Sequence, residues 1–323
     1  MTRLVEKKHP LFVTATLVTC ASCFLSPLSL SGDDFGDYWY DGQAELSGYQ
    51  FTVNRYGESR NGQAVMVYVT EPFSETKHVK VDNSYRAASD LVEVMKLNLV
   101  RDFQTGIYDY NTMISIFSRS DNFAPLKISF SSAEWCGHVY EELLFEPHRI
   151  TDQFFSYFED ESTARIINRK RNGISEDNLF ILLRSLRGPY LAPGERRSAP
   201  MLPSAFYRRL THQPISWQMA KIERMADTET IDVPAGAFTC IIYRIETSDG
   251  REGIFCVEQE HPRRIVRWQW EQVHADQHKR QLGAADGGEL TGTARMKYWE
   301  LRGNNHERYL KELGIVSNTS PGK

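Results

Sequence analysis

The feature that most constrains the fold is a long succession of β-patterned segments with little helical sequence between them. "RRIVRWQWE" shows the pattern most clearly, because Val266, Trp268 and Trp270 would share one face of a strand while polar residues alternate with the tryptophans. Strands that follow one another without intervening helices pair into antiparallel sheets rather than the parallel sheets of α/β proteins. We therefore predict a mainly β protein with a large curved antiparallel sheet or half-barrels, one short lid helix and a C-terminal helix.

Turn residues predict where the strands reverse. In "YQFTVNRYGESRNGQAVMVYVTE" the dipeptide Asn61-Gly62 separates two β-rich runs, and a two-residue turn there would set Tyr56 opposite Val67. "LVEVMKLNLVRDFQTGIYDYNTMISIF" predicts a second hairpin around Thr105-Gly106. A third hairpin is expected in "VPAGAFTCIIYRIETSDGREGIFC".

The clearest helical signal is "ISEDNLFILLRSLRGP". Ser175 is a good N-cap residue, Leu179, Leu182 and Leu186 recur at helical spacing, and Gly188-Pro189 would end the helix. We therefore expect a helix over residues 175–187 that covers part of the sheet as a lid.

Charge is unevenly distributed along a chain whose formal net charge is only −4. Residues 33–164 hold 22 acidic and 10 basic side chains, whereas residues 165–210 hold 3 acidic and 10 basic ones. The favoured interpretation is that the basic segment packs on the acidic half of the same molecule, and a site for anionic headgroups is the alternative. Five regions are predicted: a signal peptide (1–31), an N-terminal antiparallel β domain (32–160), a basic helix-plus-linker segment (161–210), a C-terminal antiparallel β domain (211–302) and a polar tail (303–323).

The first 31 residues predict export. A basic start, "MTRLVEKKH", precedes a run without charge over residues 11–31 that ends in small residues, which is the pattern of a secretory signal peptide. Two alternatives are a lipoprotein with its lipid on Cys20 or Cys23, and an uncleaved N-terminal membrane anchor. All three place the protein in the periplasm, or attached to the membrane and facing the periplasm.

Several stretches resemble bacterial families. "YWYDGQAELSGYQFTVNRYGESRNGQAVMVYVTEPF", "LNLVRDFQTGIYDYNTMISIF" and "EWCGH" are similar to an uncharacterised family of exported proteins, some of which carry a septum-formation-inhibitor (Maf) label that their sequences do not support. "VPAGAFTC" and "HPRRIVRW" resemble the C-terminal hairpins of a broader β-rich group related to the half-barrels of periplasmic lipoprotein carriers. The resemblance implies an exported β-rich fold and carries no catalytic residue with it.

One pair of residues suggests covalent catalysis. In "EWCGHVYEELLFEPH", Cys136 and His138 are the candidate nucleophile and base of a hydrolase or transferase. On a continuous strand they would lie about 6.5 Å apart, beyond a direct hydrogen bond, whereas a turn at Cys136-Gly137 would bring them closer. A packed thiol beside a half-exposed imidazole is the favoured interpretation. The sequence contains no nucleotide-binding, serine-hydrolase or zinc-protease motif.

A histidine pair suggests a metal site. His274 and His278 in "HADQH" would point the same way on a helix and could hold a metal ion. The surrounding sequence is polar, rich in glycine and without a third ligand, so we expect a loop, no metal and no other cofactor. The basic stretches "RKR" and "ERR" lack interleaved aromatic residues, and export makes nucleic acid an unexpected partner.

Cys240 and Cys256 raise the question of a disulfide, which an exported protein permits. The two residues face each other if the hairpin loop comprises residues 247–249 or 246–250. They lie on opposite faces of the hairpin if Asp249-Gly250 forms a tight two-residue turn. Because Asp-Gly favours the tight turn, we expect the two thiols to pack separately.

These features predict a non-enzymatic cell-envelope protein that binds a hydrophobic ligand such as a lipid or a lipoprotein acyl chain. A lid helix of about 18 Å is short for covering an aromatic sheet face, so we expect an apolar groove to remain. The expected partners are a lipid or an acylated protein, with membrane contact only through an N-terminal anchor. Two alternatives stay open: an enzyme that uses Cys136 and His138, and a purely structural envelope module.

Overall fold

The computed structural model describes residues 1, 34–82, 89–272 and 285–315. Within these ranges the protein is mainly β, as predicted, and sixteen strands form one sheet. The strands are β1 (Ala44–Arg55), β2 (Glu58–Ser74), β3 (Val79–Lys80), β4 (Leu91–Thr105), β5 (Tyr108–Arg119), β6 (Pro125–Glu134), β7 (Gly137–Phe145), β8 (Arg149–Ser156), β9 (Thr163–Asn168), β10 (Ile174–Ser175), β11 (Arg196–Leu202), β12 (Gln218–Val233), β13 (Gly236–Thr247), β14 (Arg251–Glu258), β15 (Ile265–Gln272) and β16 (Asp286–Met296).

Short helices accompany the sheet. They are α1 (Asp34–Trp39), α2 (Leu179–Leu182), α3 (Ala205–Thr211) and the 3₁₀ segments η2 (Tyr298–Glu300) and η3 (Asn304–Leu313). None of the helices in the described ranges has both the length and the apolar character that crossing a bilayer requires.

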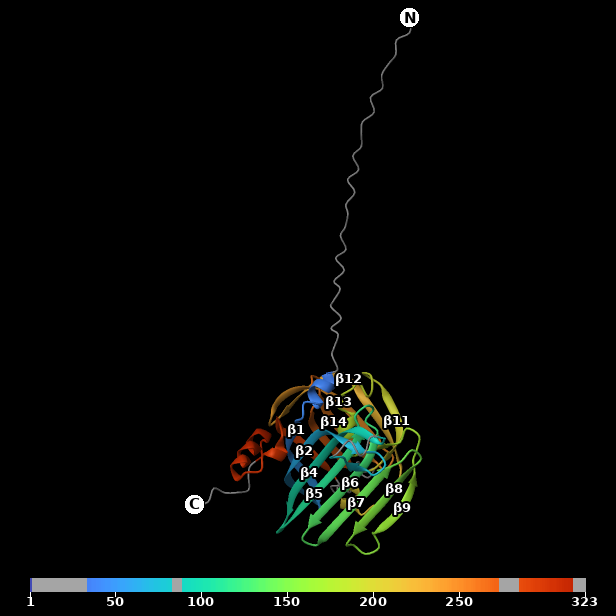
Figure 1. Cartoon of the computed structure of the whole chain (residues 1–323), viewed down its shortest axis with the longest axis vertical. Helices are drawn as coiled ribbons and strands as arrows, with labels where there is room; N and C mark the ends of the chain where they lie inside the picture. Colours follow the sequence, from blue (N-terminus) through green and yellow to red (C-terminus); the bar gives the residue numbers. More distant parts are fainter. Residues whose placement is uncertain (2–33, 83–88, 273–284, 316–323) are drawn as a thin grey trace, which may run out of the picture.

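The strand order is β10-β11-β12-β13-β14-β15-β16-β1-β2-β4-β5-β6-β7-β8-β9, and β3 pairs with β2. Neighbouring strands are antiparallel except for the short parallel pair β10 and β11. Figure 1 shows the sheet curving round, with β4–β9 on one side and β11–β14 on the other. The sheet does not close into a barrel. Because β16 pairs with β1, from Ala44 opposite Met296 to Val53 opposite Asp286, the two predicted β regions belong to one continuous sheet.

The inner face of the sheet, against which α2 and α3 pack, is filled by the protein's own side chains. One large apolar cluster joins strand residues such as Phe51, Leu99 and Trp268 to Leu179 of α2 and Phe206 of α3. The central segment, residues 174–217, therefore occupies the space that we expected to hold an open apolar groove. The interior is closely packed, and such packing contributes most of the stability of a fold of this kind.

The helix predicted over residues 175–187 was wrong in length. Only α2 is helical, and its N-cap is Asn178 rather than Ser175. Ser175 belongs to β10, and the N–H of Glu176 donates to Leu202 O of β11 at 2.9 Å. The predicted apolar stripe underestimates the burial, since residues 175–181 and 183–185 are all buried. Sheet hydrogen bonds and burial on every side therefore replace the surface lid helix.

The basic segment packs on the acidic half of the molecule, which confirms the favoured interpretation of the charge pattern. Arg184 pairs with Glu45 at 2.8 Å, and both side chains are almost completely buried. Three more arginines of this segment pair with acidic residues of the β6–β8 region, and these pairs are Arg165–Asp152, Arg208–Glu141 and Arg209–Glu134. Carboxylates of the first half thus neutralise arginines that the central segment carries into the interior.

The first hairpin turns five residues earlier in the chain than predicted. Arg55 pairs with Glu58, so the turn is Tyr56-Gly57, and both of its residues have positive φ as a type I′ turn requires. Asn61-Gly62 lies inside β2 instead. A Cβ atom on Gly62 would lie 2.2 Å from Asp102 O, so glycine is needed there for the approach of β4. The second predicted hairpin is confirmed, because Thr105 pairs with Tyr108 across a two-residue turn.

The outer face of the sheet carries smaller apolar clusters. The C-terminal segments η2 and η3 lie outside the sheet (Figure 1), where Leu313 packs with Leu46 of β1. Val266 belongs to an outer cluster, whereas Trp268 and Trp270 belong to the inner one, so the prediction that all three share a face was wrong. Cys256 of β14 pairs with Arg267 and Val257 pairs with Ile265, so Val266 is the extra residue of a bulge in β15 and points outward.

Candidate functional site

A cavity of about 330 Å³ lies between α3 and the strands at the β9 edge of the sheet. We call it the arginine cavity. Its lining residues are Glu141, Phe154, Asp160, Glu161, Thr163, Arg165, Ala205, Arg208, Arg209, His212, Gln213 and Pro214. Ala205, Arg208, Arg209 and His212 are spaced at i, i+3, i+4 and i+7, so one face of α3 and its C-cap presents them together.

The beginning and end of α3 are set by its sequence. Ser204 is the N-cap, and its hydroxyl accepts a hydrogen bond from the N–H of Phe206 at 3.1 Å. His212 ends the helix with a positive φ of 55°. This left-handed residue redirects the chain so that Gln213 and Pro214 also line the arginine cavity.

Two arginines of α3 enter the interior beside carboxylates. Arg208 Nη2 donates to Glu141 Oε2, and the two side chains are 4% and 2% exposed. Arg209 Nη2 donates to Glu134 Oε1, and its guanidinium carbon lies 4.5 Å from the centre of the Phe158 ring. Arg208 Nε and both Arg209 Nε and Nη1 have no acceptor among the described residues. Leaving these buried N–H groups without an acceptor is costly, and an anion in the cavity could supply one if the guanidinium groups turned toward it.

The carboxyl groups of Glu141 on β7 and Asp152 on β8 lie close to these arginines. Asp152 Oδ2 accepts a hydrogen bond from Arg165 Nε of β9 at 2.8 Å. Burial raises the pKa of the Glu141 carboxyl, Arg208 opposes this shift, and the nearby Asp152 carboxyl adds to it. Glu141 Oε1 and Asp152 Oδ1 have no donor among the described residues. The site thus holds two buried carboxyl groups within reach of each other and of two arginines.

An ion pair between a histidine and a glutamate belongs to the lining of the cavity. His212 Nδ1 lies 2.6 Å from Glu161 Oε1, and Ser156 Oγ donates to Glu161 Oε2 at 2.7 Å. Burial alone would raise the pKa of Glu161, but the hydrogen bonds from Ser156 and His212 lower it below its usual value. Glu161 is therefore an anion that holds His212 in place.

The chemistry of this arrangement suits an anion that has an apolar part. Guanidinium groups present several N–H donors in a fixed plane that matches carboxylate, phosphate or sulfonate oxygens. Phe154, Ala205 and Pro214 supply apolar surface on the cavity wall. Small-molecule sites in proteins combine these two properties, apolar walls and a few placed polar groups.

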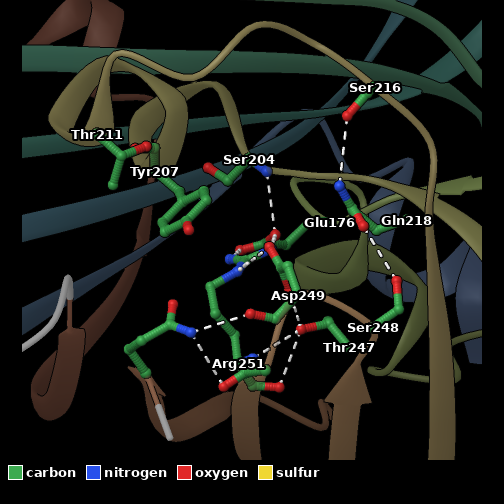
Figure 2. A network of polar contacts seen from close by, with 12 residues as sticks. Glu176, Ser204, Tyr207, Thr211, Ser216, Gln218, Thr247, Ser248, Asp249 and Arg251 are labelled. Atoms are coloured by element: carbon green, nitrogen blue, oxygen red, sulfur yellow. Dashed lines mark hydrogen bonds and ion pairs between the residues drawn. The ribbon is translucent and has the colours of Figure 1, made fainter. Parts of the chain in front are cut away.

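Figure 2 shows a different buried arginine, Arg251 of β14, in which every nitrogen has an acceptor. Arg251 Nη1 and Nη2 donate to Glu176 Oε1 and Oε2 at 3.1 and 2.9 Å, and Nε donates to Asp249 Oδ2 at 3.2 Å. The Tyr207 ring stacks 3.8 Å from the guanidinium carbon. The N–H of Ser204 completes the coordination of Glu176 at 3.0 Å. This network ties the central segment to the sheet and gives each nitrogen of Arg251 an acceptor.

The candidate catalytic pair lies outside the arginine cavity. Trp135 and Cys136 form the two-residue turn between β6 and β7, because Glu134 pairs with Gly137. Cys136 and His138 are both exposed. The hydrogen-bonding neighbour of the Cys136 thiol is Tyr157 rather than His138. The turn that we considered at Cys136-Gly137 lies one residue earlier, and neither Cys136 nor His138 lines the cavity.

Cys240 and Cys256 are both free and buried. The register pairs Cys256 with Ile242 and Cys240 with Glu258, so the cysteines are diagonal neighbours in one outer cluster. This register matches neither the facing arrangement nor the opposite-face arrangement that we considered. Burial raises the pKa of the Cys240 thiol to about 12 and that of Cys256 to about 11, which makes both thiols poor nucleophiles.

The other candidate residues lie outside the described residues. These are the lipidation candidates Cys20 and Cys23 and the metal candidates His274 and His278. In the part of the chain that the structure does describe, no group of three or more histidine, cysteine or acidic side chains is arranged to hold a metal ion.

Sequence reasoning missed Glu141, Asp152 and the two arginines of α3. A signal was present, because Glu141 shares a strand face with Val139 and Leu143, and all three are buried. Asp152 is likewise buried on the same face as Ile150. An acidic residue on the apolar face of a strand must find a partner, so such positions point to an internal charge cluster. The arginines that complete it come from a helix whose position only the tertiary structure reveals.

Comparisons of the chain with protein-family models, with curated proteins and with solved structures each returned no match. The family resemblance of the sequence therefore stays a prediction, and the function has to be inferred from the geometry of the arginine cavity.

Proposed function

We propose that the protein is a non-enzymatic ligand-binding protein of the cell envelope, and that its ligand is a small amphipathic anion such as a fatty acid or another acidic lipid fragment. The observation that carries the proposal is the arginine cavity. Arg208 and Arg209 are among its lining residues and each has a buried N–H group without an acceptor among the described residues, and Phe154 and Pro214 add apolar wall. The acidic head would bind the guanidinium groups and the hydrocarbon would contact the wall.

The size of the cavity limits the ligand. A volume of about 330 Å³ is at the lower end of the range for small-molecule sites. The inner face of the sheet is filled by the central segment, so a long acyl chain has no path along it. A short chain, or the end of a longer chain that protrudes into solvent, fits these limits.

The envelope location rests on the first 31 residues, whose basic start and uncharged run are typical of a signal peptide. An exported protein meets lipids and acylated proteins, which are sources of amphipathic anions. Membrane contact of the chain itself would come through an N-terminal anchor if the leader is retained.

The direct test is calorimetric titration of the purified protein with octanesulfonate, a short-chain anion. We expect saturable binding to one site, and we expect Arg165→Gln to weaken it at least tenfold because Arg165 lines the cavity. Arg149→Gln is the matched control, since Arg149 lies on the neighbouring strand, is exposed and pairs with Glu146 outside the cavity. Absence of saturable binding to the wild type, or equal losses in the two variants, would overturn the proposal.

A second test identifies the natural ligand. Protein purified gently from its native host is extracted with organic solvent, and the extract is analysed by mass spectrometry. A co-purifying lipid acid that is lost in Arg165→Gln supports the proposal. Two alternatives would gain from failure of both tests: a purely structural envelope module, and an enzyme that uses Cys136 and His138.

A further inference from the structure

Glu141 and Asp152 form a pair of buried carboxyl groups that the binding of an anion does not by itself explain. Their side chains are 2% and 0% exposed. Each carboxyl uses one oxygen for an arginine, Glu141 Oε2 for Arg208 and Asp152 Oδ2 for Arg165. The remaining oxygens, Glu141 Oε1 and Asp152 Oδ1, have no donor among the described residues. The two residues are diagonal neighbours on adjacent strands, because Asp152 pairs with Leu143, and both are buried.

Two acceptors can share a hydrogen bond only when a proton lies between them. Like charges at this distance repel strongly in a buried site, and the usual result is that one of the two carboxyl groups binds a proton. Burial, as the main cause, raises the pKa of the Glu141 carboxyl, and a raised pKa also favours the protonated form. The geometry therefore identifies Glu141 and Asp152 as a place where one proton can be held.

The charge balance around this pair links the proton to the ligand. Three arginines face the cavity, Arg165 from β9 and Arg208 and Arg209 from α3. The acidic groups around them are Glu134, Glu141, Asp152, Asp160 and Glu161, and His212 is held by Glu161. Carboxyl groups already outnumber the arginines, so an anionic ligand adds negative charge to a site that is acidic before it binds.

We propose that the arginine cavity binds its anionic ligand together with one proton, which Glu141 takes from solvent and shares with Asp152. Protonation of Glu141 weakens its ion pair with Arg208, and the freed guanidinium can then turn its N–H groups to the ligand. The proton offsets the charge of the ligand, so the total charge of the site does not change on binding. This inference rests on the proposed function, because it concerns the same cavity and the same class of ligand.

The test uses octanesulfonate, which stays ionised across the pH range, so that any pH dependence belongs to the protein. We expect the affinity of the wild type to increase as the pH falls, by about tenfold per pH unit where one proton is taken up per ligand. Calorimetry in two buffers of different ionisation enthalpy should show uptake of one proton per ligand. This measurement needs no variant and so does not depend on how a substitution affects folding.

Variants assign the proton. Glu141→Gln keeps the shape of the side chain and can donate to Asp152, so binding should persist and become independent of pH. Glu142→Gln is the matched control, because Glu142 is the next residue of β7 and pairs with Lys127 outside the cavity, and its pH dependence should stay that of the wild type. His212→Gln tests whether the imidazole that lines the cavity takes the proton instead. The inference is overturned if the wild type binds octanesulfonate equally at every pH, or if His212→Gln rather than Glu141→Gln abolishes the dependence. Binding without pH dependence would leave the proposed function standing, whereas no binding at any pH would remove both.

Discussion

Two buried arginine sites of this protein differ in whether every guanidinium nitrogen has an acceptor, and a site in which each nitrogen has one is called saturated. Arg251 donates from all three nitrogens to Glu176 and Asp249 and stacks on Tyr207, as Figure 2 shows. Arg208 is as deeply buried, yet its Nε has no acceptor among the described residues, and it lines a cavity. Buried charge is therefore arranged in two ways: each guanidinium nitrogen has an acceptor in one region, and some have none in the other.

The difference has a physical origin in the carboxylates. Glu176 is held by Arg251 and by the N–H of Ser204, so both of its oxygens are occupied. Glu141 has one free oxygen that faces the carboxyl of Asp152. A saturated pair loses stability when either partner is removed, whereas a site with a carboxyl that can bind a proton has a way to lower its charge.

The largest effect is expected from breaking the saturated pair. Arg251→Met leaves Glu176 buried without its main partner, and the free energy of unfolding should fall by about 3–5 kcal/mol. Urea denaturation followed by tryptophan fluorescence measures this. In the double variant Arg251→Met with Glu176→Leu, much of the loss should be recovered because no charge is left buried. A loss below about 1 kcal/mol in the single variant would show that the two regions do not differ.

A smaller effect is expected at Asp177, which follows Glu176 in the saturated region. Burial first, and then the charge of Glu176, raise the pKa of Asp177 to about 6, although hydrogen bonds from Ser204 and the N–H of Ala205 oppose the shift. The folded state therefore holds the proton more tightly than the unfolded state. The resulting stability is present below pH 4 and is lost as the pH rises through about 6, by at most about 3 kcal/mol.

Asp177→Asn should remove this pH-dependent part. We expect the stability difference between the variant and the wild type to shift in favour of the variant as the pH rises from 4 to 8. Urea denaturation of both proteins at a series of pH values measures the difference. Parallel stability curves would mean that Asp177 has its ordinary pKa in the folded protein.

A still smaller loss of stability is expected when the ion pair of Arg208 and Glu141 in the arginine cavity is broken. Arg208→Met should cost about 1–3 kcal/mol at neutral pH, because Glu141 can bind a proton that it shares with Asp152. The same reasoning gives the sign of the pH effect: the cost should decrease as the pH falls, since Glu141 becomes neutral. A cost that equals that of Arg251→Met and does not vary with pH would contradict the distinction between the two regions.

The smallest effect is expected outside both regions. Cys136→Ser changes an exposed turn residue, so the free energy of unfolding should stay within about 0.5 kcal/mol of the wild type and the affinity for octanesulfonate should be unchanged. Thermal melting and calorimetric titration of the variant measure both quantities. A weaker affinity for octanesulfonate in this variant would contradict the placement of Cys136 outside the binding site.

The sequence by itself determined the class of fold and the sign of its internal charges. Alternating segments joined by short turns require antiparallel strands, and the Thr105-Gly106 region was correctly predicted to reverse the chain. The opposite charge balance of residues 33–164 and 165–210 correctly predicted that one packs on the other. These properties are local or additive, so they can be read without knowing which residues meet.

The tertiary structure alone decided register, burial and the site. Asn61-Gly62 has the stronger local turn preference, yet in the folded protein it lies inside β2, which pairs with both β1 and β4, and the turn is Tyr56-Gly57. Residues 175–187 have helical spacing, but the sheet surrounds them and draws their ends into strand hydrogen bonds. The arginine cavity combines residues from β7, β8, β9 and α3 that are far apart in the chain. A contact between distant segments depends on the summed burial of the whole sheet, and no local pattern contains that sum.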